Sequence, residues 1–77
     1  NLTGAKLKYA NLRNADISGA NLTKANLLGV DLTEANLKEV NLTGANLKYA
    51  KLNILGLVGA HFCATIMPDG AINNSSC

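Results

Sequence analysis

Two cysteines and one histidine near the end of the chain are the residues best suited by type to carry chemistry. Cys63 and Cys77 flank a turn signal, Pro68-Asp69-Gly70, and His61 lies two positions before Cys63. Two Cys and one His do not complete a structural zinc site, which takes four ligands. A disulfide would close a loop of about fifteen residues and stabilise the fold by about 3 kcal/mol. We expect a structural disulfide between Cys63 and Cys77; two free thiols, or a metal or redox role, are the alternatives.

Catalytic pairs are not indicated elsewhere. The five carboxylates are scattered, and three of them, Asp31, Glu34 and Glu39, fall in one stretch but on different faces of the arrangement derived below. The single His is expected on the surface, and the glycines form no phosphate-binding fingerprint. We therefore predict a protein that is not an enzyme, with no catalytic residues, no metal site and no cofactor.

The composition narrows the class of protein further. The chain has 77 residues, of which 48% are hydrophobic, 4% aromatic and 16% charged, and its formal net charge is +2. No apolar run approaches the roughly 20 residues of a membrane span, so no membrane insertion is expected. The basic residues are few and fall on several sides, which disfavours nucleic acid as a partner. These values predict one small domain with a core of small aliphatic side chains.

The chain repeats with a period of five residues from Ala5 to Ala64. The first place of each block is mostly Ala, with Leu55 among the exceptions; the second is mostly Asn or Asp, and the third is Leu in all but two blocks. The fourth and fifth places vary and carry most of the charge. On a helix a step of five residues rotates about 140°, which would spread the leucines around the whole circumference. On a strand the same step would alternate them between faces.

The period is satisfied if the chain extends for about three residues and then turns a corner that aims the next Ala-x-Leu inward. Four such corners close a square coil of about twenty residues, and stacked coils bond to each other at the strand spacing of about 4.8 Å. The sequence therefore predicts an all-β solenoid of about three coils. Its expected core is Leu2, Leu7, Leu12, Ile17, Leu22, Leu27, Leu32, Leu37, Leu42, Leu47, Leu52, Leu57 and Phe62.

This run of A(N/D)LXX blocks resembles the pentapeptide repeat family from Asn1 to about Ala64. The resemblance implies a right-handed, quadrilateral β-helix with the third-place residue and the small first-place residue inside. It also implies that second-place Asn or Asp side chains support the turns. We expect looser support at Lys6, Lys51, Gly56 and His61, which depart from that preference. Residues 1–64 are predicted to form the coil, and residues 65–77 a C-terminal capping segment.

The end of the chain has a second, narrower resemblance. Phe62-Cys63-Ala64-Thr65-Ile66-Met67-Pro68-Asp69-Gly70 followed by Cys77 resembles the ending of cyanobacterial pentapeptide repeat proteins. Those relatives lie in the thylakoid lumen, the periplasm or the cytoplasm. A disulfide favours an oxidising compartment. The thylakoid lumen or the periplasm is therefore expected if the disulfide forms, and the cytoplasm otherwise.

The most distinctive exterior residues share one side. Lys8, Tyr9, Leu28, Lys48 and Tyr49 fall one above another in the twenty-residue register, and we interpret them as a small face for an unknown protein partner. Two unremarkable surface tyrosines are the alternative reading. The expected function is a non-enzymatic structural or interaction module, a rigid rod with flat faces. It is expected to be a monomer, or a dimer through the N-terminal coil, whose edge the sequence leaves uncapped.

Some members of the family mimic DNA and inhibit type II topoisomerases, which provides an alternative function. Duplex DNA carries about one negative charge per 1.7 Å of its axis, so three coils would need on the order of eight unopposed negative charges. The chain has five acidic residues against seven basic ones. Its charge and its length therefore both disfavour the DNA mimic.

Overall fold

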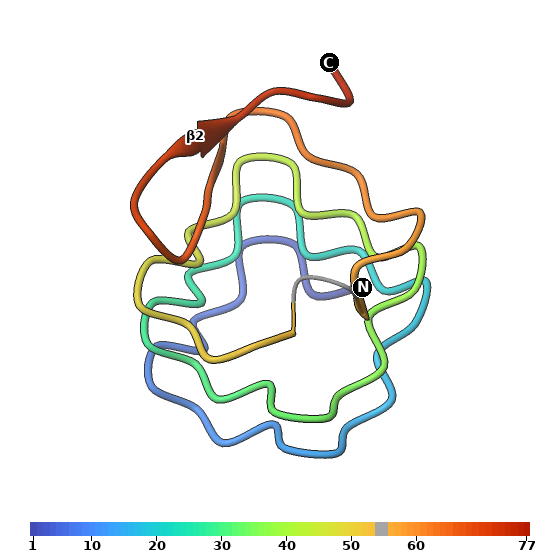
Figure 1. Cartoon of the computed structure of the whole chain (residues 1–77), viewed down its shortest axis with the longest axis vertical. Coiled ribbons are helices and arrows are strands. Elements are labelled where there is room, and N and C mark those ends of the chain that lie inside the picture. Colours follow the sequence, from blue (N-terminus) through green and yellow to red (C-terminus); the bar gives the residue numbers. More distant parts are fainter. Residues whose placement is uncertain (54–55) are drawn as a thin grey trace.

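The backbone of the chain winds into stacked loops (Figure 1). The computed structural model describes residues 1–53 and 56–77. Parallel bridges join residues twenty apart, such as Lys6 to Asn26 and Asn26 to Asn46. The bridges within the described residues form four ladders, which begin at Lys6, Asn11, Asp16 and Asn21. Each loop therefore has four sides, and the chain has a β-helix-like fold.

Regular strands are short because each side extends for only a few residues before the next corner. The described residues contain β1 (Thr65–Ile66) and β2 (Ile72–Asn73), which pair antiparallel with Thr65 opposite Asn73 and Ile66 opposite Ile72. The other contacts between coils are isolated parallel bridges at the second place of each block. In Figure 1, β2 lies at the end of the stack next to the C-terminus.

All five backbone N–H groups of residues 41–45, in the middle of the stack, have a hydrogen-bond acceptor. In block 41–45, Asn41 donates to the Ala20 carbonyl of the coil before it at 2.9 Å, and Leu42 and Gly44 donate to carbonyls of the coil after it. The N–H of Ala45 closes the corner on the carbonyl of Leu42 at 2.9 Å. Such complete pairing is what backbone removed from water requires.

The remaining N–H group, that of Thr43, donates to a side chain. Thr43 N–H donates to Oδ1 of Asn41 at 3.1 Å, an Asx turn that nearly every second-place Asn or Asp repeats. Three second-place residues without this acceptor are Lys6, Gly56 and His61. The N–H groups two positions after them, at Lys8, Val58 and Cys63, have no acceptor within the described residues. The expected loss of turn support is thus confirmed at these three corners.

The third-place residues of the middle coils form the core. Leu22, Leu27, Leu32 and Leu37, from four successive sides of one coil, are each at most 2% exposed. Leu42, Leu47 and Leu57 are also buried, as are the first-place residues Ala25, Val30, Val40 and Ala45. Leu7, Leu12, Ile17, Leu52 and Phe62 are partly buried and pack against this core.

Leu2 is the exception to the predicted core. Leu2 is 39% exposed, whereas Leu7, Leu12 and Ile17 of the same coil are partly buried. The period places Leu2 on the inner side of the tube, but it is not among the residues that pack against the core. Leu55, the first-place residue named above as an exception to Ala, lies outside the described residues.

Among the described residues, the fifth place of a block is a left-handed corner. Twelve of these positions have φ between 52° and 74°, five of them glycines and seven of them other residues, including Tyr9, Glu34 and Ala64. A non-glycine residue pays a steric penalty for this conformation. The corner persists because its N–H is held by the next coil, as in Tyr9 N–H to the Leu28 carbonyl at 2.8 Å.

Stacked bonding continues past residue 64, where the coil was predicted to end. Leu47 N–H donates to the Ile66 carbonyl at 2.8 Å, and Tyr49 N–H donates to the Pro68 carbonyl at 3.0 Å. From Thr65 onward the chain also pairs antiparallel with residues 72 and 73, so both kinds of bonding occur beyond the predicted boundary. Within residues 1–53 and 56–77, no helix has the length and apolar character of a membrane span.

We predict that the core tolerates truncation very unequally along the stack. Leu27→Ala removes a side chain that is 0% exposed and should lower the free energy of unfolding by about 2–5 kcal/mol. Leu2→Ala removes a side chain already in contact with water and should cost less than about 1 kcal/mol. Urea denaturation of the two variants measures the difference, and equal losses would contradict the stacked core.

Candidate functional site

Four stacked segments form the side of the coil that carries both tyrosines. Lys6, Asn26, Asn46 and Ile66 form its ladder of bridges. We call residues 6–9, 26–29 and 46–49 the tyrosine–lysine face. It contains all five predicted partner residues, Lys8, Tyr9, Leu28, Lys48 and Tyr49, and it adds Lys6, which the sequence analysis did not single out. The signal for Lys6 was its second-place position in the same register.

The two tyrosines project into water from equivalent corners. Tyr9 is 67% exposed and Tyr49 is 65% exposed. Their φ angles are 60° and 64°, so both side chains leave the backbone in the same way. They lie two coils apart, which is about 9.6 Å at the usual strand spacing.

Each tyrosine is paired with the lysine before it. Lys8 Nζ lies 5.6 Å from the centroid of the Tyr9 ring, and Lys48 Nζ lies 5.2 Å from that of Tyr49. Both distances allow a cation–π attraction of about 0.5–1 kcal/mol at exposed sites. None of the three lysines of the face forms an ion pair with a carboxylate in the described residues. Their charges are therefore available to a partner.

Gly29 makes room for the Tyr9 ring. A Cβ atom at Gly29 would meet Cδ1 and Cε1 of Tyr9 at an impossibly short distance, so the ring lies directly over the Gly29 backbone.

The other end of the face adjoins a hollow of about 410 Å³ lined by Met67, Pro68, Asp69, Ala71, Ile72 and Asn73.

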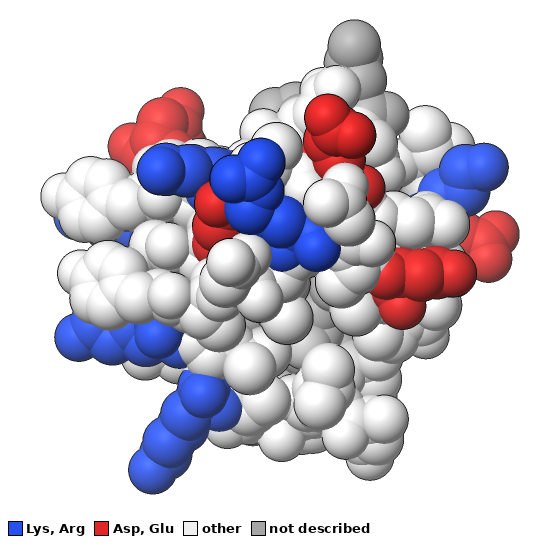
Figure 2. Space-filling view, turned by 90° about the horizontal axis from the view of Figure 1, so that it is seen from below, with Lys and Arg blue, Asp and Glu red and all other residues white. Residues whose placement is uncertain are grey.

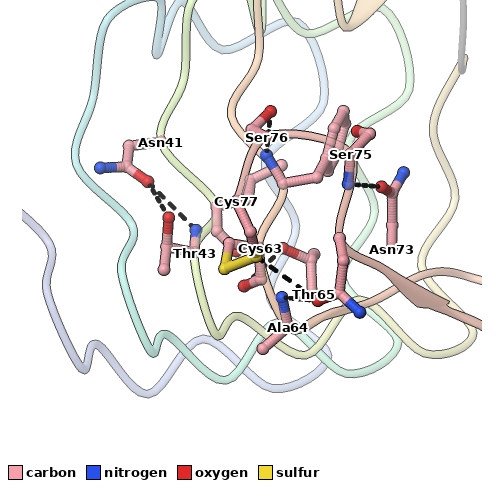
Figure 3. The surroundings of a disulfide bond; sticks show 12 residues. Asn41, Thr43, Cys63, Ala64, Thr65, Asn73, Ser75, Ser76 and Cys77 are labelled. Atoms are coloured by element: carbon pink, nitrogen blue, oxygen red, sulfur yellow. Dashed lines mark hydrogen bonds between the residues drawn. A yellow bond between two sulfur atoms is a disulfide. The ribbon is translucent and has the colours of Figure 1, made fainter.

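Cys63 and Cys77 are joined by a disulfide, with their Cα atoms 5.0 Å apart. The bond ties the end of the chain to the last coil, directly after Thr43 in the stack (Figure 3). Thr65, which follows Cys63 on the same turn of chain, is fully buried and donates from Oγ1 to the Leu42 carbonyl at 2.7 Å.

The chain end also supplies hydrogen-bond acceptors that a further coil would otherwise provide. Phe62 N–H donates to Ser76 Oγ at 3.0 Å, and Ala64 N–H donates to Asn74 Oδ1 at 2.7 Å. Met67 N–H donates to the Ala71 carbonyl at 2.8 Å. These acceptors could not be predicted from the sequence, because Asn and Ser in a polar tail have no periodic signal.

His61 is exposed, and the described residues hold no group of three or more His, Cys, Asp or Glu that could bind a metal ion.

A hollow of about 760 Å³ lies on the side next to the tyrosine–lysine face, among Thr33, Glu34, Ala50, Lys51, Leu52 and Asn53. Glu34 is the one carboxylate among these lining residues, so the hollow offers no pair for acid–base chemistry.

Two second-place carboxylates are held in their charged form by the turns that they support. Hydrogen bonds from the hydroxyl and then the N–H of Ser18 lower the pKa of Asp16 below its ordinary value of 3.8. The hydroxyl and the N–H of Thr33 lower the pKa of Asp31 in the same way, with smaller contributions from the charges of Arg13 and Lys51. A carboxylate that accepts hydrogen bonds favours its ionised form.

The sequence of this four-sided coil matches the family described as pentapeptide repeats, with eight copies over residues 1–38 and 20–53. The chain belongs to the pentapeptide repeat family. A comparison with curated proteins gives no match.

Among solved structures, this pentapeptide repeat chain is similar to HetL, a pentapeptide repeat protein involved in heterocyst differentiation regulation from the cyanobacterium Nostoc sp. strain PCC 7120. The two are 37% identical, with a TM-score of 0.36. The alignment covers 92% of the present chain and 40% of HetL, so the chain spans less than half the length of that relative.

We predict that acid weakens the fold through Asp16 and Asp31. Their pKa values are lowered in the folded state, so their contribution is present above the unfolded pKa near 3.8 and is lost as the pH falls through the folded values. Asn supports the same turn at Asn41. The Asp16→Asn/Asp31→Asn variant should therefore lose less thermal stability than the parent between about pH 5 and pH 2. Parallel acid profiles of melting temperature would contradict this role.

The disulfide yields a separate stability prediction. Reduction, or the Cys63→Ser/Cys77→Ser variant, should lower the free energy of unfolding by about 3 kcal/mol, because the cross-link closes a 14-residue separation. Urea denaturation with and without reductant measures the loss. The double variant should show no response to reductant, and an unchanged parent protein would exclude a stabilising bridge.

Proposed function

We propose that this chain is a non-enzymatic protein-interaction module that presents its tyrosine–lysine face to a protein partner. The observation that supports the proposal most directly is the pair of exposed, equivalent tyrosines. Each lies beside a lysine that forms no ion pair with a carboxylate of the described residues. Tyr is enriched in protein interfaces because its ring buries much area at a small cost in conformational entropy. On this face the lysine and tyrosine side chains are exposed, whereas Leu27 and Leu47 point inward and belong to the core.

The backbone beneath the face is suited to recognition because it is held rigidly. Tyr9 N–H donates to the Leu28 carbonyl and Tyr49 N–H to the Pro68 carbonyl, so both corners are fixed to the next coil. A partner therefore binds side chains whose backbone is already ordered, which lowers the entropic cost of association.

The finer architecture is part of the proposal. We infer a right-handed coil of about three turns, closed at its C-terminal end by residues 65–77 as a cap. Support for the cap comes from the acceptors Ser76 Oγ and Asn74 Oδ1, which bond to the N–H groups of Phe62 and Ala64 in the last coil. Capping of this kind prevents edge-to-edge association.

The disulfide is the basis for a proposal about the cellular compartment of the protein. A bridge that stabilises a small domain persists where thiols are oxidised. We therefore propose an oxidising compartment, the thylakoid lumen or the periplasm. The DNA-mimic alternative gains no support, because the side with the most exposed aromatic surface carries lysines rather than carboxylates.

Site-specific photo-crosslinking tests the interaction face. The chain carrying p-benzoylphenylalanine in place of Tyr49 should form a discrete adduct in cells of the native host. The matched control places the same group at Glu34, a fifth-place corner with φ of 60° on another side. Adducts at both positions, or at neither, would contradict a partner specific to the tyrosine–lysine face.

A further inference from the structure

The tyrosine–lysine face concentrates the positive charge of the protein. With residues 66–69 that continue it, this side carries three lysines and one carboxylate, a balance of +2 that equals the net charge of the whole chain. The other three sides together balance to zero. In Figure 2, basic side chains lie at the lower left of the visible surface without an acidic neighbour, whereas acidic side chains lie at the upper left, in the centre and on the right. The charge of one face thus selects an acidic partner.

The one carboxylate on this side is already engaged. Asp69 lies at the C-terminal end of the face and accepts a hydrogen bond from Ala71 N–H at 3.0 Å within its own turn. It forms no ion pair with Lys48. The ammonium groups of Lys8 and Lys48 rest against their own tyrosine rings, which leaves them to be neutralised by carboxylates from outside.

The spacing of the two lysine–tyrosine pairs matches the repeat of one extended peptide conformation. The pairs repeat every two coils, a distance of about 9.6 Å. A polyproline II helix has three residues per turn and a rise of 3.1 Å, so residues three apart lie on one side at about 9.3 Å. A β-strand fits less well, because its residues three apart face opposite sides.

Resting on the proposed function, we propose that the tyrosine–lysine face binds an acidic polyproline II segment of a protein partner. Its carboxylates, three residues apart, would pair with Lys8 and Lys48. Its proline rings would pack on Tyr9, Tyr49 and Leu28, since proline-rich segments dock on exposed aromatic side chains. Lys6 lies at the N-terminal end of the same side and extends the positive charge by one position.

Single-stranded nucleic acid is a different class of partner and fits the face less well. It would use stacked bases together with a positive groove that follows the phosphates. The face contains no arginine. The Tyr9 ring is also occupied on one side by Gly29, which reduces its surface for a base. An oligonucleotide is accordingly the competing probe in the test.

The experiment measures binding of a fluorescent peptide with four Glu-Pro-Pro repeats to the intact disulfide-bonded chain at low ionic strength. Fluorescence anisotropy should show saturable binding. The Lys8→Gln/Lys48→Gln variant should bind at least tenfold more weakly. The matched control, Lys24→Gln/Lys38→Gln, loses the same charge from two other sides and should change the affinity less than twofold. Equal weakening in the two double variants would reduce the effect to net charge and overturn the proposal.

Two further comparisons test spacing and shape. A peptide with the same composition but adjacent glutamates should bind at least threefold more weakly. Gly29→Ala displaces the Tyr9 ring without changing charge and should weaken binding at least threefold. Gly19→Ala, whose added Cβ meets nothing within 4 Å at a similar φ of +70°, should have less effect. Indifference to spacing, or tighter binding of a twelve-residue oligothymidylate, would overturn the polyproline partner.

The outcomes separate this inference from the proposed function. A photo-adduct at Tyr49 without peptide binding at millimolar concentration would overturn the acidic polyproline partner while leaving the interaction face in place. Absence of both the adduct and peptide binding would overturn the two proposals together.

Discussion

The hydrogen bonding between consecutive coils is the constraint on which the rest of the structure depends. A block of five residues has five backbone N–H groups, and in block 41–45 four of them bond to backbone carbonyls and the fifth to Asn41 Oδ1. Leaving one such group unpaired in a dry interior costs about 1–3 kcal/mol. The coil geometry, the Asx turns and the left-handed corners are all consequences of satisfying these groups within five residues.

The repeat period was sufficient to predict a β-helix-like stacking of coils. A step of five excludes both a helix and a straight strand, and the twenty-residue register correctly brought Leu22, Leu27, Leu32 and Leu37 into one layer of the core. The two tyrosines could also be aligned, because the register fixes which corners are equivalent. Prediction succeeded wherever a property depends only on position within the repeat.

It was less successful where a property depends on neighbours outside the repeat. Leu2 occupies an inner position yet is exposed, unlike the equivalent Leu7, Leu12 and Ile17 of the same coil. The acceptors Asn74 and Ser76 come from a tail without periodicity, so their partners follow only from how the tail folds back.

The left-handed corners have a consequence for how such a surface can change. The described fifth-place residues all adopt the same unusual backbone angle, whether they are Gly, Tyr, Lys or Glu, and none of them belongs to the buried core. Substitutions there leave the interior almost untouched, and the four walls vary independently of one another. The fourth- and fifth-place residues of one side, two in each coil, can therefore change during evolution while the buried core is kept.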